Sequence, residues 1–152
     1  MKKMLKYEPL KQENYDLCWQ TITNIFSCYY TGKPYFTTTN SPKTGRYDAV
    51  NAINAATGKA LEDLIDGDFP EYPLIAHTIK KGQLIYIALH DVTLDDDSLH
   101  DAIIVGFDDN GERICIYDPT TGVEQWHAYK YGDSYQDSTS GKTFDFDCFA
   151  SI

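Results

Sequence analysis

The sequence is short of basic residues and has no long apolar run. It holds 13 Lys and Arg against 23 Asp and Glu, which gives a formal net charge of −10. Nucleic-acid phosphates and anionic lipids attract basic faces, so this balance argues against both as partners. No apolar run approaches the roughly 20 residues that span a bilayer. Residues 1–9 begin basic but lack the apolar segment of a signal peptide. We therefore expect no membrane span, and either an intracellular chain or one whose leader has been removed.

Cysteines at metal-binding spacing are also lacking. The sequence has four cysteines, and none of them forms a C-x-x-C pair, which argues against a zinc ribbon and against a thioredoxin-like dithiol. Four cysteines are too few for a disulfide scaffold in a chain of 152 residues, so we expect at least one free thiol. No motif predicts a metal or another cofactor.

Length and composition favour a single domain over residues 1–152. Hydrophobic residues make up 42% of the chain and charged residues 24%, which suffices for a packed core. After an extended segment over 1–16, apolar periodicity predicts helices at 17–31, 47–57 and 73–80, with a short helical piece at 61–65. Strands are predicted at 84–89, 102–107, 113–117, 122–129 and 143–150, and polar loops at 35–46, 91–98 and 134–141. Helices followed by an antiparallel sheet make the predicted class α+β.

Cys18 has the predicted environment that suits a nucleophile best. Asn14 or Asp16 can cap the first helix. If Asp16 is the cap, Cys18 lies in the first turn, where unpaired N–H groups and the helix dipole favour a thiolate. A buried structural cysteine is the alternative, and for a single cysteine it is the commoner one. Cys28 lies about 280° further around the helix, so it cannot share the site and is expected in the core. Two more cysteines fall in predicted strands and are expected to be structural: Cys115 and Cys148.

A histidine at the mouth of the sheet could serve Cys18 as a base. His100 opens one predicted strand and Asp118 ends the next, with a hairpin turn near Asn110 between them, so the two side chains should lie side by side. Asp118 could then hold the imidazole in the tautomer that accepts a proton. Taken alone, Asp118 before a proline is an ordinary turn. The other histidines are weaker candidates: His77, His90 and His127.

Gln12 stands six residues before Cys18. A side-chain amide in that place can donate a hydrogen bond to the oxyanion of an attacked carbonyl, together with the backbone N–H of Cys18. Alone, a glutamine in a polar stretch has no such meaning.

Three segments together resemble the papain-like cysteine peptidases. They are residues 12–19, with the Gln-to-Cys spacing and the Cys-Trp pair of that family, then 100–107 after the histidine, and 116–122 with its Asp-Pro. The last two segments look most like small bacterial branches, among them the leader peptidases of bacteriocin exporters and the papain-like effectors of plant pathogens. One departure is Asp101, since the residue after the histidine is commonly small in this family. The extra carboxylate could raise the pKa of the base or contact substrate.

The resemblance implies a helical half with Cys18 packed on an antiparallel sheet half with His100 and Asp118, and a site in the cleft between them. It implies a thiol hydrolase of peptide bonds with Gln12 in the oxyanion hole. It also implies Trp19 and Asp101 beside a peptide or protein substrate.

Other functions remain open at this level. Amidase or acyl-transfer activity could use the same triad. A non-catalytic peptide-binding or interaction module could retain the fold, although the presence of both Cys18 and His100 argues against it. A carbohydrate or partner surface built from the 12 tyrosines has no motif behind it.

Gln12→Ala tests the six-residue spacing. We expect kcat to fall about 10²–10³-fold with KM little changed, because an oxyanion donor acts in the transition state more than in the bound substrate. Gln12→Glu should be at least as harmful, since a carboxylate repels the oxyanion. Steady-state kinetics on a peptide substrate measure both variants, and near-normal turnover of Gln12→Ala would remove the spacing as support for the family.

Overall fold

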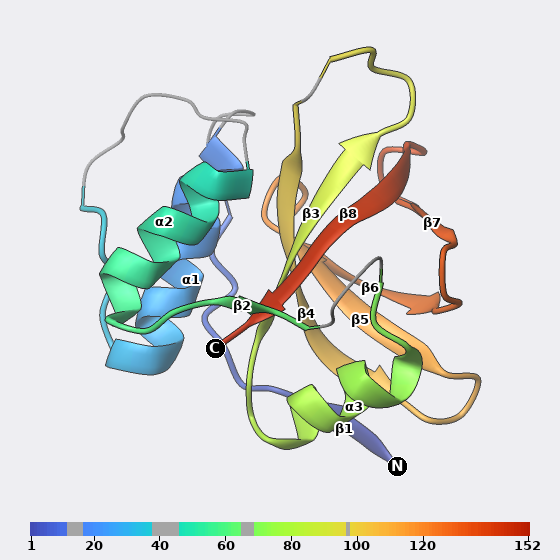
Figure 1. The fold of residues 1–152 in the computed structure, drawn as a ribbon, viewed down its shortest axis with the longest axis horizontal. Coiled ribbons are helices and arrows are strands. Elements are labelled where there is room, and N and C mark those ends of the chain that lie inside the picture. The colour runs from blue at the N-terminus through green and yellow to red at the C-terminus, as the bar shows by residue number, and fades with distance from the viewer. Residues whose placement is uncertain (12–16, 38–45, 65–68, 97) are drawn as a thin grey trace.

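A computed structural model describes residues 1–152 apart from 12–16, 38–45, 65–68 and 97 (Figure 1). The helices are α1 (Cys18–Thr31), α2 (Arg46–Thr57) and α3 (Tyr72–Lys80). The first strands are β1 (Lys2–Met4), β2 (Glu62–Asp63), β3 (Ile85–Asp91) and β4 (His100–Asp108). The later strands are β5 (Arg113–Asp118), β6 (Val123–Ala128), β7 (Ser134–Gln136) and β8 (Thr143–Ser151).

One antiparallel sheet forms the body of the fold, in the order β2-β8-β3-β4-β5-β6. In Figure 1, α1 and α2 lie together on one side of this sheet, and α3 lies at its other end beside β1. Helix α1 packs against both α2 and β4. The predicted α+β class with an antiparallel sheet is therefore confirmed. Over the described residues, no helix is both long and apolar enough to cross a membrane.

Helix α1 forms as its apolar spacing predicts. Ile22, Ile25 and Phe26 face the core and are completely buried, as expected of residues three and four apart on one helix face. Gly32 ends the helix in the left-handed conformation (φ 85°), and its N–H reaches the carbonyl of Cys28. The residue before the helix, Leu17, makes no side-chain capping bond. The predicted caps, Asn14 and Asp16, lie outside the described residues.

One helix prediction and one loop prediction are wrong, because in both segments the backbone pairs with a strand that is distant in the sequence. The short helix predicted at 61–65 is instead strand β2, which pairs Glu62 with Ser151 of β8, while residue 65 is outside the described part. The polar loop predicted at 134–141 begins with strand β7, which pairs Tyr135 with Phe144 of β8. Residues 1–16, expected to be extended, begin with strand β1. Each of these short strands is stabilised by a partner far away in the sequence, which local periodicity does not report.

Strand β4 lies at the centre of the sheet, and both of its edges are paired. One edge pairs with β5, with a bulge between Ile104 and Gly106. The other edge is divided, since β3 pairs with residues 100–104 and β1 pairs with residues 106–108. The eight residues of β4 after His100 are all buried. This double pairing fixes the position of His100 at the end of the strand.

Gly106→Ala tests the close approach of β1 to β4. A Cβ at this position would meet the sulfur of Met4 and lie 2.8 Å from the carbonyl oxygen of Lys3. We expect a loss of about 1–3 kcal/mol in the free energy of unfolding, the usual cost of overpacking. Urea unfolding measures it, with exposed Val123→Ala as the control. The double variant Met4→Ala/Gly106→Ala removes the contact with the Met4 sulfur but keeps the contact with the Lys3 carbonyl oxygen. It should therefore regain only part of the lost free energy of unfolding. Unchanged stability of Gly106→Ala would contradict the packing.

Candidate active site

The thiol of Cys18 lies at the junction of α1 and the sheet. Cys18 is the first residue of α1 and is only 3% exposed. Because α1 packs on β4, its first turn meets the beginning of that strand. There the Sγ of Cys18 donates a hydrogen bond to Oδ2 of Asp101 at 3.3 Å. The nucleophile candidate is thus held against a carboxylate of β4.

His100 and Asp118 lie side by side, which confirms the hairpin prediction. The pairing of Ile103 with Tyr117 aligns the start of β4 with the end of β5. The Nε2 of His100 is 2.7 Å from Oδ1 of Asp118, and the Thr120 backbone N–H donates to the same oxygen at 2.8 Å. Asp118 is therefore fixed from two sides and in turn fixes the ring.

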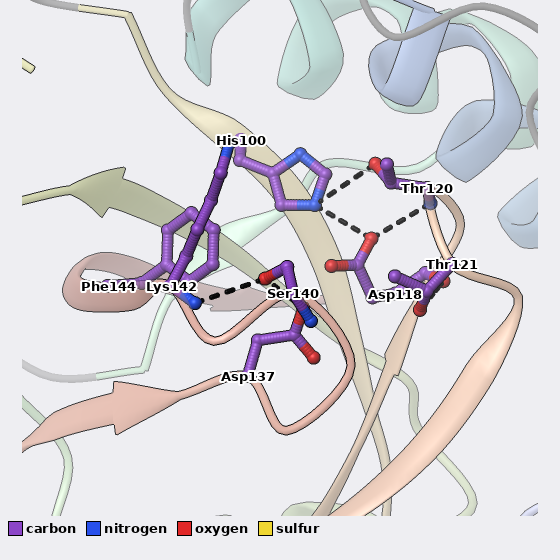
Figure 2. Close-up of a pocket in the computed structure, with 8 residues that line it drawn as sticks. All are labelled: His100, Asp118, Thr120, Thr121, Asp137, Ser140, Lys142 and Phe144. Carbon is purple, nitrogen blue, oxygen red and sulfur yellow. Dashed lines mark hydrogen bonds and ion pairs between the residues drawn. The ribbon is translucent and has the colours of Figure 1, made fainter.

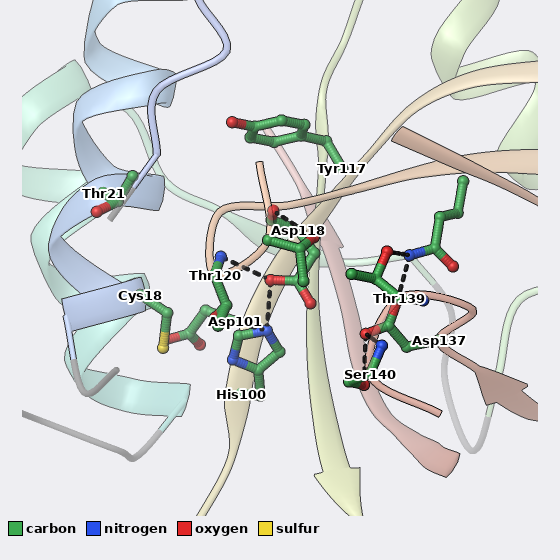
Figure 3. Close-up of polar contacts among 12 residues, drawn as sticks. Cys18, Thr21, His100, Asp101, Tyr117, Asp118, Thr120, Asp137, Thr139 and Ser140 are labelled. Atoms are coloured by element: carbon green, nitrogen blue, oxygen red, sulfur yellow. Dashed lines mark hydrogen bonds and ion pairs between the residues drawn. The ribbon is translucent and has the colours of Figure 1, made fainter. Parts of the chain in front are cut away.

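The hydrogen bond to Asp118 sets the tautomer of the neutral imidazole. A carboxylate only accepts, so Nε2 carries the proton and Nδ1 is left with a free lone pair. Figure 3 shows Nδ1 of His100 on the side of the ring that faces Cys18 and Asp101. The nitrogen able to take a proton therefore points toward the thiol, and the other points toward the orienting carboxylate.

The surroundings of His100 favour its charged form. Burial alone favours the neutral ring, but the hydrogen bond and the charge of Asp118 outweigh it, so the pKa of His100 is raised above its ordinary value. The negative charges of Asp101 and Asp137 act in the same direction. An imidazolium formed during a reaction would be stabilised here.

The expectation of a readily formed thiolate at Cys18 is wrong for this structure. Burial raises the pKa of the Cys18 thiol well above its usual range, and the charge of Asp101 raises it further. A helix N-terminus favours a thiolate by a modest amount, and removal from water together with a carboxylate at hydrogen-bond distance opposes it more strongly. The surroundings of Cys18 therefore favour the protonated thiol, which donates to Asp101.

Asp101 is completely buried and uses both carboxylate oxygens within the protein. Oδ2 accepts from Cys18, and Oδ1 accepts from the hydroxyl of Tyr86 at 2.5 Å. Burial raises the pKa of Asp101 to about 6, although the bonds from Tyr86 and Cys18 and the nearby His100 favour its charged form. At neutral pH the carboxyl is mostly ionised.

A small pocket opens beside His100 and Asp118 (Figure 2). Its volume is about 80 Å³, enough for a few waters or a small side chain. The ring of Phe144 stacks on His100 with centroids 5.7 Å apart. The remaining lining residues come from the β5–β6 and β7–β8 turns: Thr120, Thr121, Asp137, Ser140 and Lys142.

The remaining predicted site residues are placed as follows. Gln12 lies outside the described residues. Trp19 is 3% exposed and packs its ring against Phe36, with centroids 5.2 Å apart. Neither Trp19 nor Asp101 reaches the surface, so their predicted contact with substrate gains no support from the structure.

The other cysteines and histidines lie in different surroundings. Cys115 and Cys148 are buried in strands, as expected. The prediction that Cys28 lies in the core is wrong. Cys28 is half-buried and lines a surface pocket with Tyr29, because it lies at the margin of the apolar face of α1.

The other histidines are in environments unlike that of His100. His77 is exposed on α3, and Nε2 of His90 lies 3.1 Å from the carbonyl oxygen of Asp96. His127 packs edge-on against the ring of Tyr135.

Sequence reasoning missed Tyr86 and Phe144. Tyr86 sits in a continuous apolar run, where a tyrosine is expected to be core, and its pairing with Ile103 in the neighbouring strand is what brings its hydroxyl to Asp101. Phe144 comes from a strand far along the chain. Only the alternation of residues in β3 could have suggested that Tyr86 shares a face with Asp101.

Neither the protein-family models nor the curated protein sequences contain a match to this chain. Among the residues that the structure describes, no three His, Cys, Asp or Glu side chains gather as metal ligands.

Asp118→Asn tests the electrostatic coupling to His100. Asparagine can still accept the hydrogen bond from Nε2, but it lacks the charge that stabilises the imidazolium. We therefore expect the pKa of His100 to fall, measured by NMR titration of the ring, with the resonances of His77 and His90 unmoved. An unchanged His100 titration would contradict the coupling.

The coupling between Asp118 and His100 also makes the free energy of unfolding depend on pH. A histidine whose pKa is raised in the folded state stabilises the fold below its unfolded pKa, and that contribution is lost as the pH rises through the folded pKa. The stability advantage of the native chain over Asp118→Asn should therefore shrink as the pH rises from the ordinary histidine pKa of about 6.5 through the raised pKa of folded His100. Urea unfolding at several pH values measures it.

Proposed function

We propose that this protein is a thiol hydrolase that cleaves peptide bonds with a papain-like arrangement of Cys18, His100 and Asp118. The observation that carries the proposal is the orientation of His100. Its Nε2 is tied to Asp118 at 2.7 Å and its Nδ1 faces the thiol side of the site (Figure 3). An orienting acid, a base and a nucleophile in this order are the parts that nucleophilic catalysis needs.

The arrangement of the elements also supports a papain-like fold. A largely buried helix begins with the nucleophile and packs on the central strand of an antiparallel sheet. That strand begins with the base, and its hairpin partner ends with the orienting acid. This is the division into a helical half and a sheet half that the resemblance implies.

The first half of the reaction forms an acyl-enzyme. The proton of the Cys18 thiol passes to Nδ1 of His100 as Sγ attacks the carbonyl carbon of the substrate. Asp118 stabilises the imidazolium that forms. The C–N bond then breaks, the imidazolium returns its proton to the leaving amine, and a thioester on Cys18 remains.

The second half releases the acid product. His100 takes a proton from a water molecule, which attacks the thioester carbonyl. The C–S bond breaks, and the proton on the imidazolium returns to the sulfur of Cys18. The cycle needs no cofactor, because each proton that His100 accepts is given back within the same half-reaction.

Two further candidates use the same site differently. Amidase or acyl-transfer chemistry would keep the acyl-enzyme and change only the acceptor or the bond attacked. A non-catalytic peptide-binding module is favoured by one specific observation, since the thiol donates to Asp101 and its burial there opposes ionisation. Incubation with peptides, with peptidoglycan and with amine acceptors separates these.

Active-site labelling with a thiol-reactive peptide inhibitor, together with turnover of a peptide library, tests the proposal. We expect Cys18→Ala to abolish labelling and to lower turnover to background, a loss on the order of 10⁶-fold if it behaves as other nucleophile deletions do. His100→Ala should lower the rate about 10²–10⁴-fold, the usual cost of losing a general base. Thermal unfolding checks that both variants fold.

Matched controls come from the same chain. Cys28→Ala removes the more exposed thiol of the same helix, and His77→Ala removes an exposed histidine. Both should keep native turnover and labelling. If Cys28→Ala abolishes labelling while Cys18→Ala keeps it, the site assignment is wrong. Absence of both turnover and Cys18 labelling in the native protein would favour the non-catalytic module.

A further inference from the structure

Asp101 is a buried ionisable group that the proposed mechanism does not use. It is completely buried at the second position of β4, next to the proposed base. A carboxylate in that position must be compensated, because isolated charges are costly away from water. Its two oxygens are compensated by two donors from different elements, the thiol of Cys18 and the hydroxyl of Tyr86.

We propose that Asp101 is a positioning residue that holds Cys18 as a protonated thiol hydrogen-bonded to its carboxylate, so that the thiolate forms readily only when Asp101 itself carries a proton. The proposal deepens the proposed function and rests on it for any effect on catalysis. Its physical content, the coupling between one thiol and one carboxyl, can be measured without any substrate.

The charged and titratable groups that act on Asp101 come from four elements. Helix α1 contributes Cys18 and strand β3 contributes Tyr86, both as hydrogen-bond donors. Strand β4 contributes His100, whose charge favours an ionised Asp101, and helix α2 contributes Asp48, whose charge opposes it. The thiol and the Tyr86 hydroxyl both lie at hydrogen-bond distance from Asp101, and a thiol is ordinarily the more acidic of the two.

Two acidic groups at 3.3 Å cannot both ionise without repulsion. In the neutral pH range the pair therefore holds one proton, shared between sulfur and oxygen, and it titrates as a unit. Below the pKa of Asp101, which is about 6, the thiolate fraction rises with pH in the ordinary way. Above it, each further ionisation meets the charge of Asp101, so the thiolate fraction levels off before it rises again.

Tyr86 sets the pH at which the thiolate fraction of Cys18 levels off. Its hydroxyl donates to Asp101 and so stabilises the charged carboxylate. Without that donor the carboxyl keeps its proton to a higher pH. A merely structural Asp101 would give no reason for the reactivity of Cys18 to depend on a hydroxyl in β3.

The test is the rate of alkylation by iodoacetamide at each cysteine as a function of pH, resolved by mass spectrometry of the native chain. The variants are Asp101→Asn and Tyr86→Phe. The matched control is Asp108→Asn, which replaces another buried, hydrogen-bonded carboxylate of the same strand. Cys115, buried in β5, reports any general opening of the fold within the same sample.

For the native chain we expect the logarithm of the Cys18 rate to rise with pH and to flatten from about pH 6. In Asp101→Asn the flat region should disappear, and the rate at pH about 8 should be about 100-fold higher. In this variant the thiolate fraction keeps rising about tenfold per pH unit above pH about 6, where the native fraction is level. In Tyr86→Phe the flat region should begin at higher pH, while Asp108→Asn should match the native profile.

Two outcomes overturn the inference: a native Cys18 profile without a flat region, or an Asp101→Asn profile identical to the native one. A rise at Cys115 equal to that at Cys18 would also overturn it, because the effect would then be loosening of the fold. Failure of the proposed function looks different, since the Cys18 profile would change as expected while no peptide, peptidoglycan or acyl-transfer substrate turns over.

Discussion

The pairing of β4 with β5 is the interaction on which the candidate site depends. It aligns the first residue of one strand with the last residue of the other, and so brings His100 and Asp118 within hydrogen-bond distance. The pairing of β3 and β1 along the opposite edge of β4 prevents that strand from shifting. A shift of one residue would exchange the side-chain faces and separate the pair.

Two carboxylates on β4 and β5 have different consequences for the two candidate groups beside them. Asp118 raises the pKa of His100 and so favours the charged imidazolium, while Asp101 raises the pKa of Cys18 and so favours the uncharged thiol. The difference follows from alternation along a strand: His100 and Asp101 are neighbours in sequence and turn toward different partners. The site therefore combines a carboxylate that favours a charged His100 with a carboxylate that opposes a charged Cys18.

The sequence was sufficient for the features that depend on short-range pattern. Helix α1 followed from its apolar spacing and Gly32, and the neighbours His100 and Asp118 followed from a hairpin turn between two apolar runs. Features that depend on distant partners were not predictable. Strands β2 and β7 exist only because β8 offers them an edge, and the raised pKa of the Cys18 thiol exists only because packing brings it to Asp101.

The separations along the chain have a consequence for how the site assembles. His100 and Asp118 are 18 residues apart within one hairpin, whereas Cys18 and Asp101 are 83 residues apart. Closing the longer loop costs more chain entropy, so we expect contacts of the first kind to form earlier during folding. The pair of His100 and Asp118 would then form within the hairpin, and Cys18 would join it only when α1 docks. A chain arrested before α1 docks would have His100 already oriented by Asp118, with the thiol of Cys18 still away from the sheet.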